Sequence, residues 1–317
     1  MTALPTTVTP MLATLTDDRF SDPNWIFERK WDGVRCLAFR SASGAVRLRS
    51  RNDQVLDGTY PEIADALATE ADVALLLDGE VVAFDGRHTS FERLQGRLGI
   101  HRAEEARATG IAVYYYVFDV LHVDGQDVRE LALRDRKRLL RQAVRFADPL
   151  RFTSHRNGAG VEEYRKACAR GDEGVIAKRA DSPYRSGRSG DWLKFKCVRD
   201  QELVVGGFTA PKGSRVAFGA LLVGYYDGAE FVYAGKVGTG FDTRTLRDLY
   251  DRMAKLHRPT SPFARGTVRE RDVQWVEPEL VAEIGFTEWT RDGLLRHPRY
   301  LGLRTDKHAS EVVREQR

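Results

Sequence analysis

The sequence predicts an α+β protein of two domains, a mixed domain over residues 1–199 followed by a small β-barrel over residues 200–317. The first reason is the length of 317 residues, because a domain holds roughly 150 residues. The second is that helical patterns and strand-like runs are interspersed in the first domain. The third is that the remaining chain shows several short strand-like runs and a single helical pattern.

Three helical patterns lie in the first domain. Pro61, which suits the first turn of a helix, opens the pattern over 60–68. Over 129–146, leucines form a partial apolar stripe beneath a dense surface of arginines and lysines. The third pattern covers 161–170, where the following glycine stops the helix in the usual way.

The strands of this domain are expected where apolar residues form short runs. The run AVYYYVFDVL at 112–121 is rich in β-branched and aromatic residues and too short for a helix, which predicts a buried strand. The other expected strands lie at 27–39, 73–77, 81–84, 175–177 and 192–197.

The second domain is expected to be mostly β-structure. Asp227-Gly228 is a strong hairpin signal between two strand-like runs. One helix is predicted over 243–256, where Leu246, Leu249 and Met253 share a face. The expected strands cover 203–208, 220–226, 231–234, 273–276 and 280–289. Short strands with one helix fit an OB-like barrel.

Composition excludes several classes of protein. No run approaches the ~18 consecutive apolar residues of a membrane span, and the N-terminus lacks the pattern of a secretory signal. Cys36, Cys168 and Cys197 are scattered without a CxxC pair, so we expect neither a disulfide framework nor a cysteine-based zinc site. We expect the protein to reside in a reducing cytoplasm. The formal charge of +4 permits a polyanionic partner without indicating one.

The segment 28–35, ERKWDGVR, places Lys30 between Arg29 and Arg35. A lysine becomes a nucleophile when it is deprotonated, and both partial burial and nearby cations lower its pKa. Gly33 would let the backbone approach a ligand closely. A surface strand that ends in an Asp-Gly turn has the same pattern, so this segment alone leaves both interpretations open.

Two further segments combine carboxylates with strands. Asp78-Gly79-Glu80 follows an apolar run, and alone such an Asp-Gly pair is more often a plain turn. In the segment 173–178, EGVIAK, a carboxylate at a helix-to-strand junction precedes a lysine on the strand.

Two basic segments follow. In WLKFK at 192–196, period-two alternation places Lys194 and Lys196 on one face and Leu193 and Phe195 on the core side. The two lysines repel each other unless an anion lies between them, although a solvated edge strand would also tolerate them. The segment 291–307 holds five basic and two acidic residues, which also suits an ordinary surface loop. Positive charge is therefore local, although the total is nearly balanced.

Together and in this order, these segments resemble the motifs of the covalent nucleotidyltransferase superfamily and, within it, the ATP-dependent DNA ligases. The stretches EGVIAKRADSPYRSG, FTEWTRDG and LRHPRYLGLR are most similar to bacterial ligases of the ligase C type and to the ligase module of ligase D. The matching motifs are KWDGVR at 30–35, Ser50-Arg51, Asp78-Gly79-Glu80, FDVL at 118–121, EGV at 173–175, LKFK at 193–196 and GLRTDK at 302–307.

The resemblance implies a fold and a reaction. A nucleotidyltransferase (ATP-grasp-like adenylation) domain would precede an OB-fold domain. Lys30 would attack the α-phosphate of ATP to give lysyl-AMP, AMP would pass to the 5′-phosphate of a nicked or broken duplex DNA, and the 3′-hydroxyl would displace it. These steps are phosphoryl transfers, in which positioning and charge neutralisation supply most of the catalysis.

The resemblance also implies roles for single residues. Lys194 and Lys196 would neutralise the α-phosphate, and Lys196 would help to keep Lys30 neutral. Glu80 and Glu173 would face Mg²⁺ or Mn²⁺, because hard cations prefer oxygen ligands. At the base, Glu28 would lie beside the edge of adenine and Phe118 would stack on it, and Lys178 would belong to the nucleotide site. Asp32 and Asp78 would orient nearby cations, and Arg35, Arg51 and Arg188 would contact ribose, the nick phosphate or the DNA backbone. Arg304, Asp306 and Lys307 would reach the pyrophosphate when the OB domain closes.

Alternatives within the superfamily are an RNA ligase and an mRNA capping guanylyltransferase. A non-catalytic nucleic-acid-binding protein with a decayed ligase fold would have lost the nucleophile or the carboxylates, which are present here. The motifs are not accompanied by a helical DNA-binding domain, so we expect salt-sensitive DNA binding and a repair protein that recruits the enzyme. We expect a monomer in the bacterial cytoplasm, associated with the nucleoid and not with a membrane.

Overall fold

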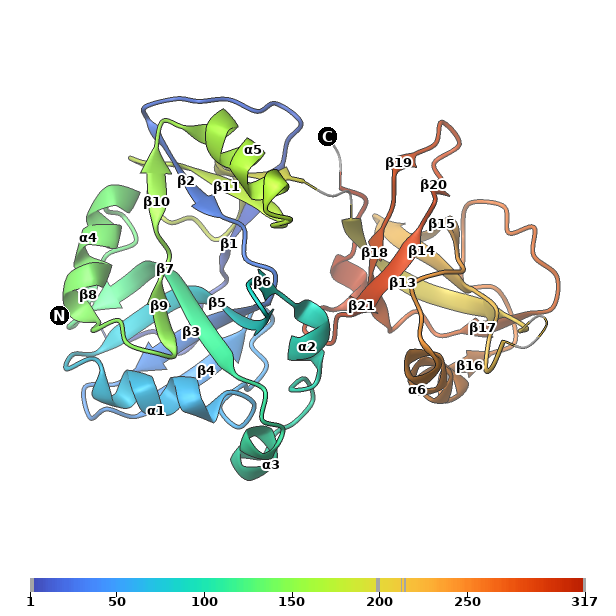
Figure 1. Cartoon of the computed structure of the whole chain (residues 1–317), viewed down its shortest axis with the longest axis horizontal. Coiled ribbons are helices and arrows are strands. Elements are labelled where there is room, and N and C mark those ends of the chain that lie inside the picture. Colours follow the sequence, from blue (N-terminus) through green and yellow to red (C-terminus); the bar gives the residue numbers. More distant parts are fainter. Residues whose placement is uncertain (1–2, 198–199, 212, 214, 316–317) are drawn as a thin grey trace. The chain divides into compact units, whose positions relative to one another are not determined.

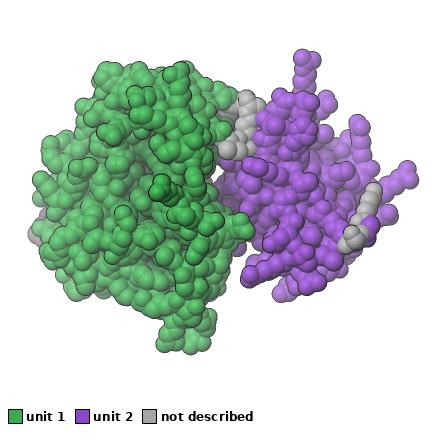
Figure 2. Space-filling view, viewed as in Figure 1, with its two compact units in different colours: residues 1–197, 317 green, residues 198–316 purple. Residues whose placement is uncertain are grey.

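The computed structural model describes residues 3–197, 200–211, 213 and 215–315 (Figure 1). The chain divides into two compact units, unit 1 from Met1 to Cys197 and unit 2 from Val198 to Gln316 (Figure 2). The predicted boundary at residue 199 lies outside the described residues. Each unit has its own hydrophobic core. Among the described residues, no helix combines the length and the apolar character needed to span a bilayer.

Unit 1 contains two β-sheets. In the first sheet β1 and β12 are parallel and the other neighbours antiparallel, in the order β1 (Met11–Leu15), β12 (Gly187–Lys196), β11 (Gly174–Arg179), β2 (Trp25–Arg29) and β10 (His155–Asn157). The second sheet has the order β4 (Val46–Ser50), β3 (Val34–Arg40), β5 (Leu75–Asp85), β7 (Val113–Val123) and β8 (Gln126–Asp127), with β6 (His88–Thr89) on β5 and β9 (Leu150–Phe152) on β7.

The predicted helices of unit 1 are present, with changes at their ends. The helices are α1 (Pro61–Thr69), α2 (Phe91–Gln95), α3 (Ala103–Ala108), α4 (Leu133–Ala143) and α5 (Gly160–Ala169). The helix predicted over 129–146 is shorter, because Val144 adopts an extended backbone that ends it. The short helices α2 and α3 were not predicted.

The segment predicted as one strand over 27–39 forms two strands in different sheets, β2 and β3. Residues 30–33 lie between them, and there the chain crosses from the first sheet to the second. Gly33 is required at this crossing, since a Cβ there would lie 2.1 Å from the carbonyl oxygen of Val81. Lys30 lies at this break, directly after the last residue of β2.

The two sheets of unit 1 face each other across a small apolar cluster. The first sheet and its loops contribute Met11, Tyr184 and Trp192, and the second sheet contributes Leu37, Phe39, Leu76, Phe118 and Leu121. The far face of the second sheet packs into the largest core of the unit, which includes residues of α1, α2 and α4. The far face of the first sheet packs against α5.

In the part of unit 2 that the structure describes, a seven-stranded sheet is accompanied by one α-helix. The sheet runs in the order β15 (Glu230–Val237), β14 (Leu221–Asp227), β13 (Asp200–Thr209), β17 (Val273–Val276) and β16 (His257–Arg258), and β18 (Val281–Gly285) pairs with both β13 and β21 (Arg299–Leu303). The remaining elements are α6 (Thr243–Ala254), the hairpin of β19 (Glu288–Trp289) and β20 (Leu295–Arg296), and a 3₁₀ turn at Ala309–Glu311.

Two sequence signals of unit 2 are confirmed and one is corrected. The Asp227-Gly228 turn joins β14 to β15 as predicted. Helix α6 begins where predicted, and the Asp242 side chain caps it by accepting a hydrogen bond from the N–H of Thr245 at 2.7 Å. The strand predicted over 280–289 is divided into β18 and β19, which belong to different sheets.

Candidate active site

Lys30 lies directly after β2, beside the start of β11. Its backbone N–H donates to the carbonyl of Gly174 at 2.9 Å, which fixes the end of β2 against β11. Its Nζ forms an ion pair with Oε1 of Glu173, and the side chains of Lys30 and Glu173 are 19% and 16% exposed. The lysine predicted as nucleophile and the carboxylate predicted to face the metal are therefore in direct contact.

Strands β2, β11 and β12 place several charged side chains on the same face. Ile176 of β11 pairs with both Glu28 of β2 and Lys194 of β12, and Gly174 pairs with Lys196. Directly paired residues of antiparallel strands point to the same side of a sheet, so Glu28, Lys194 and Lys196 share one face.

The opposite face of the same strands is apolar. Phe27, Val175 and Phe195 are buried there in one cluster, against which Leu193 packs. The predicted alternation of the segment 192–196 is confirmed, since Phe195 is fully buried while Lys194 and Lys196 are half-buried.

Glu28 is buried between two lysines. Its carboxylate pairs with Lys178 of β11 at 2.7 Å and contacts the Nζ of Lys137 of α4. Burial pushes the pKa of Glu28 upward, but the charges of Lys137 and Lys178 outweigh it, so that the pKa is lowered overall. Burial is the main cause that lowers the pKa of Lys178 to about 8, with Glu28 opposing it.

Lys137 was not among the residues predicted for the site. The helix was interpreted as an apolar stripe beneath a basic surface, which assigns lysines to solvent. A signal was nevertheless present, because Lys137 stands at helical spacing between Leu133 and Leu140 and therefore lies on the buried face of α4. Its Nζ also donates to the carbonyls of Phe118 and Thr153, each at 3.2 Å.

Phe118 of β7 is buried between charged and aromatic side chains. The Arg35 guanidinium lies 4.6 Å from the ring centroid, and the Lys178 Nζ lies 4.1 Å from it. Trp192 meets the ring edge to face at 5.9 Å. Since Phe118 is 7% exposed, a base can stack on it only where one of these neighbours moves away.

Asp78 holds Arg35 in a two-pronged pair. The carboxylate accepts from Nε and Nη2 of Arg35 at 2.5 and 2.6 Å, and the hydroxyl of Tyr184 donates to it at 2.6 Å. Asp78 is fully buried, so these donors compensate its charge. Glu80, two residues further along β5, is half-buried and pairs in register with Arg35 of β3 and Tyr116 of β7.

The other predicted residues of unit 1 lie nearer the surface. Asp32 is half-buried in the connection between β2 and β3, and Arg51 is half-buried in the turn after β4. Arg188 is exposed and donates to the carbonyl of Ala13 at 3.0 Å. It lies near the start of β12, whereas Lys194 and Lys196 lie at its end, so the structure does not bring Arg188 beside the two lysines.

The three predicted residues of unit 2 form charge pairs within that unit. Arg304 makes a two-pronged pair with Asp306, both contacts at 3.0 Å, and Lys307 pairs with Glu202 at 3.0 Å. Burial acts to lower the pKa of Arg304, but Asp306 outweighs it, and the pKa is raised above the ordinary value. The C-terminal motif is thus a built cluster of charges rather than a plain basic loop.

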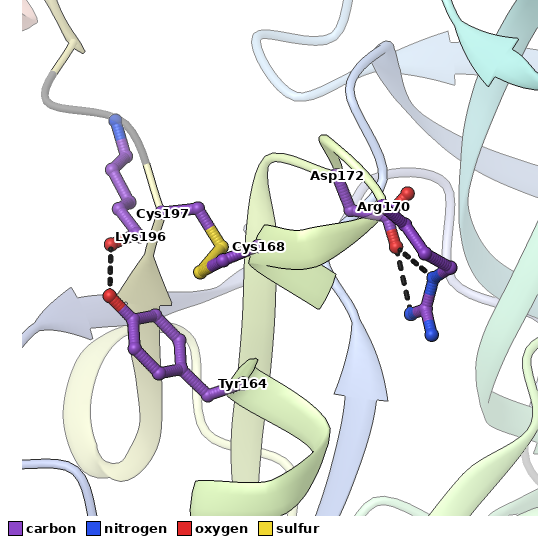
Figure 3. The surroundings of a disulfide bond; sticks show 6 residues. All are labelled: Tyr164, Cys168, Arg170, Asp172, Lys196 and Cys197. Carbon is purple, nitrogen blue, oxygen red and sulfur yellow. Dashed lines mark hydrogen bonds and ion pairs between the residues drawn. A yellow bond between two sulfur atoms is a disulfide. The ribbon is translucent and has the colours of Figure 1, made fainter. Parts of the chain in front are cut away.

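The cysteines differ from expectation. Cys168 of α5 and Cys197, directly after β12, form a disulfide with a Cα–Cα distance of 5.2 Å (Figure 3). The expectation of no disulfide is therefore wrong, although Cys36 is a free, buried thiol. The pair was missed because its 29-residue separation carries no motif. The two cysteines meet because α5 leads into β11, and β11 pairs antiparallel with β12.

Among the described residues, no group of three His, Cys, Asp or Glu side chains gathers to hold a metal. Mg²⁺ bound to phosphates needs only one or two protein carboxylates, since phosphate oxygens and waters supply the other ligands. Glu173 and Glu80 are the predicted carboxylates available for this purpose.

Two family models match the chain. One, described as "ATP dependent DNA ligase domain", covers residues 10–196, and the other, "ATP dependent DNA ligase C terminal region", covers residues 214–307. The chain belongs to the ATP-dependent DNA ligase family. The predicted family is therefore confirmed, and so is the fold of a nucleotidyltransferase domain followed by an OB-fold domain.

Individual relatives of this ligase-family chain agree with that assignment. It is 39% identical over 323 residues to "Multifunctional non-homologous end joining protein LigD" of Pseudomonas aeruginosa, with 99% of this chain and 37% of the relative covered. A protein of Mycobacterium tuberculosis, named "Multifunctional non-homologous end joining DNA repair protein LigD", is 39% identical over 317 residues, with 96% of this chain and 40% of the relative covered. The chain thus spans less than half the length of these curated relatives.

A solved structure is similar over nearly the whole chain. The structure described as "mycobacterial DNA ligase D complexed with ATP and MES" is 36% identical in sequence and has a TM-score of 0.67. The similarity covers 97% of this chain and 98% of that chain. The similarity therefore includes both units of this chain, and that mycobacterial structure was solved with ATP bound.

Proposed function

We propose that this protein is an ATP-dependent DNA ligase that seals breaks between a 5′-phosphate and a 3′-hydroxyl in duplex DNA. The observation that carries the proposal is the contact of Lys30, directly after β2, with Glu173, directly before β11, in a sheet that presents Lys194 and Lys196 on one face. A nucleophilic lysine, a carboxylate and two further cations suit the attack of an amine on a phosphate.

In the first step the Nζ of Lys30 forms a bond to the α-phosphorus of ATP, and pyrophosphate leaves. Lys30 must lose its proton before attack, and Glu173 is the carboxylate in contact with it that can accept the proton. Lys194 and Lys196 face the developing charge on the α-phosphate. Their positive charges also repel a protonated Lys30 and so favour its neutral amine. A Mg²⁺ or Mn²⁺ ion held by Glu80 and Glu173 would neutralise phosphate charge.

Glu28, Lys178 and Phe118 are proposed to form the adenine end of the site. Phe118 supplies an aromatic surface, and the buried Glu28 with its two lysines supplies polar groups beside it. Arg35 lies over the same ring and is held by the buried Asp78, which fits a contact with the nucleotide ribose.

In the later steps AMP passes from Lys30 to the 5′-phosphate of the DNA, and the 3′-hydroxyl then displaces AMP as the phosphodiester forms. We assign Arg51 and Arg188 to DNA phosphates, Asp32 to the orientation of nearby cations, and the cluster of Arg304, Asp306 and Lys307 to the pyrophosphate of ATP. The names of the relatives favour repair of broken DNA by end joining as the setting. We infer a monomer that acts at the bacterial nucleoid and is brought to breaks by a repair protein.

The proposal is tested by covalent labelling. The full chain is incubated with Mg²⁺ and ATP labelled at the α-phosphate, with GTP and NAD as controls, and then with nicked DNA or nicked RNA duplex. Lys30→Ala should abolish the label while the protein stays folded, whereas Lys166→Ala, which removes an exposed lysine of α5, should leave it intact. Labelling of the Lys30→Ala variant would refute the nucleophile. Preference for GTP or for RNA would replace the proposal by a capping enzyme or an RNA ligase.

A further inference from the structure

The disulfide lies at the edge of the proposed active site. Cys168 is in the last turn of α5, and Cys197 directly follows Lys196 (Figure 3). Both cysteines are half-buried, so a small thiol can reach the bond. Cys36, which is distant from them in sequence, is fully buried. The three cysteines therefore divide into one accessible pair and one protected thiol.

Cys197 is bonded directly to Glu173 and Lys196, two residues of the proposed active site. Its backbone N–H donates to the carbonyl of Glu173 at 3.0 Å. Its neighbour Lys196 pairs in register with Gly174, and the Tyr164 hydroxyl of α5 donates to the Lys196 carbonyl at 3.3 Å (Figure 3). The disulfide thus adds a covalent link between α5 and the strand end that carries Lys196.

The loop that follows Cys168 leads to the partner of the nucleophile. The Asp172 carboxylate pairs with Arg170 at 2.8 Å (Figure 3). It also pairs with Arg29 at 2.7 Å, and Glu173 is the next residue. Since Arg29 directly precedes Lys30, the chain from Cys168 to Glu173 is held at one end by the disulfide and at the other by ion pairs beside the nucleophile.

We propose that Cys168 and Cys197 are a reversible oxidation site whose state sets the rate at which Lys30 is adenylated. The proposal rests on the proposed ligase function. In the oxidised state the Sγ–Sγ bond holds the end of β12 against α5. A dithiol reduces it when its thiolate attacks one sulfur and releases the other cysteine as a thiolate, and its second thiol then completes an intramolecular disulfide in the reductant. Two electrons and two protons pass from the dithiol to the two cysteines.

The reduced state should adenylate more slowly. Without the disulfide, the end of β12 is held by the hydrogen bonds of Cys197 and Lys196, which open more readily than a covalent link. Positioning makes a large contribution to phosphoryl transfer, and a displacement of about 1 Å can cost a factor of roughly 100 in rate. A loosened but still paired strand end should cost less, and we expect roughly a tenfold decrease in the rate of adenylation.

The experiment uses the full chain in both states. Oxidised protein and protein treated with a dithiol are alkylated and their masses measured, which counts free thiols without using activity. Adenylation of Lys30 by labelled ATP is then followed over time in each state. The variants Cys168→Ser and Cys197→Ser should react at the slow rate with or without the dithiol, and Cys36→Ala should keep the response of the wild type.

Three results decide the proposal. The expected result is alkylation of two additional cysteines after reduction, with slower adenylation. The faster rate should return when a small-molecule disulfide accepts two electrons and two protons from the two cysteines and is itself reduced to two thiols. Equal adenylation rates in the two states, with the ligase still labelled, would overturn the redox site alone. Absence of labelling in every state and variant would instead overturn the proposed function together with the inference built on it.

Discussion

Replacing Lys137 by methionine should destabilise unit 1, because it removes one of the two cations that hold the buried Glu28 carboxylate. Lys137 and Glu28 are 2% and 3% exposed, so water cannot replace the lost partner. The carbonyls of Phe118 and Thr153 would also lose a donor. Breaking a buried ion pair costs about 3–5 kcal/mol, and since Lys178 still pairs with Glu28 at 2.7 Å, we expect about 3 kcal/mol.

The assay is urea unfolding of the full chain at neutral pH, followed by circular dichroism, with the transition of unit 1 compared between variants. Arg138→Met is the matched control, because Arg138 is the next residue of α4 but its side chain is 67% exposed and pairs with the exposed Asp135. This change should alter the free energy of unfolding by no more than about 0.5 kcal/mol. Equal effects of the two substitutions would refute the buried pair as a stabilising element.

Three further predictions follow from the same structure. The pKa of the Lys178 amine is lowered to about 8 in the folded chain, against 10.5 in the unfolded chain. At pH values between these two, the unfolded chain therefore binds more protons than the folded chain, and stability rises with pH. Unfolding titrations from pH 8 to 10 should therefore show the free energy of unfolding of the wild type rising by about 2 kcal/mol relative to Lys178→Met, and a constant difference would contradict the shift. Phe118→Leu should raise the KM for ATP by a factor of about 2–13, which corresponds to about 0.5–1.5 kcal/mol of lost stacking, and an unchanged KM would remove Phe118 from the adenine site. The disulfide joins cysteines separated by 29 residues, so reducing it should lower the free energy of unfolding of unit 1 by about 3–4 kcal/mol. Urea unfolding with and without a dithiol measures this change, and identical midpoints would contradict it.

Strand β5 shows what local patterns can and cannot predict. Its two apolar runs were recognised, but Asp78-Gly79-Glu80 between them favoured a turn and in fact lies in the middle of a continuous strand. Asp78 is tolerated there because Arg35 and Tyr184, both distant in sequence, compensate its charge. Gly79 is needed for packing, since a Cβ there would lie 2.4 Å from the ring of Tyr115. Such compensation is invisible until the strands are paired.

The segments of the candidate site could be recognised from their residue types and order, but their partners could not. Lys30 and Glu173 are 143 residues apart, and only the pairing of β2 with β11 brings them together. The disulfide was missed for the same reason, because the link between Cys168 and Cys197 depends on how α5 joins the sheet.

The site depends on the packing of two sheets as much as on the motifs. Phe118 belongs to the second sheet, and Trp192 of the first sheet touches its edge at 5.9 Å. Arg35 of the second sheet and Lys178 of the first lie over the same ring, at 4.6 and 4.1 Å. A shift of one sheet against the other would therefore change the environment of the ring and of the buried lysine at once. Motifs spread over residues 28–196 act as one site because the apolar cluster between the sheets fixes that packing.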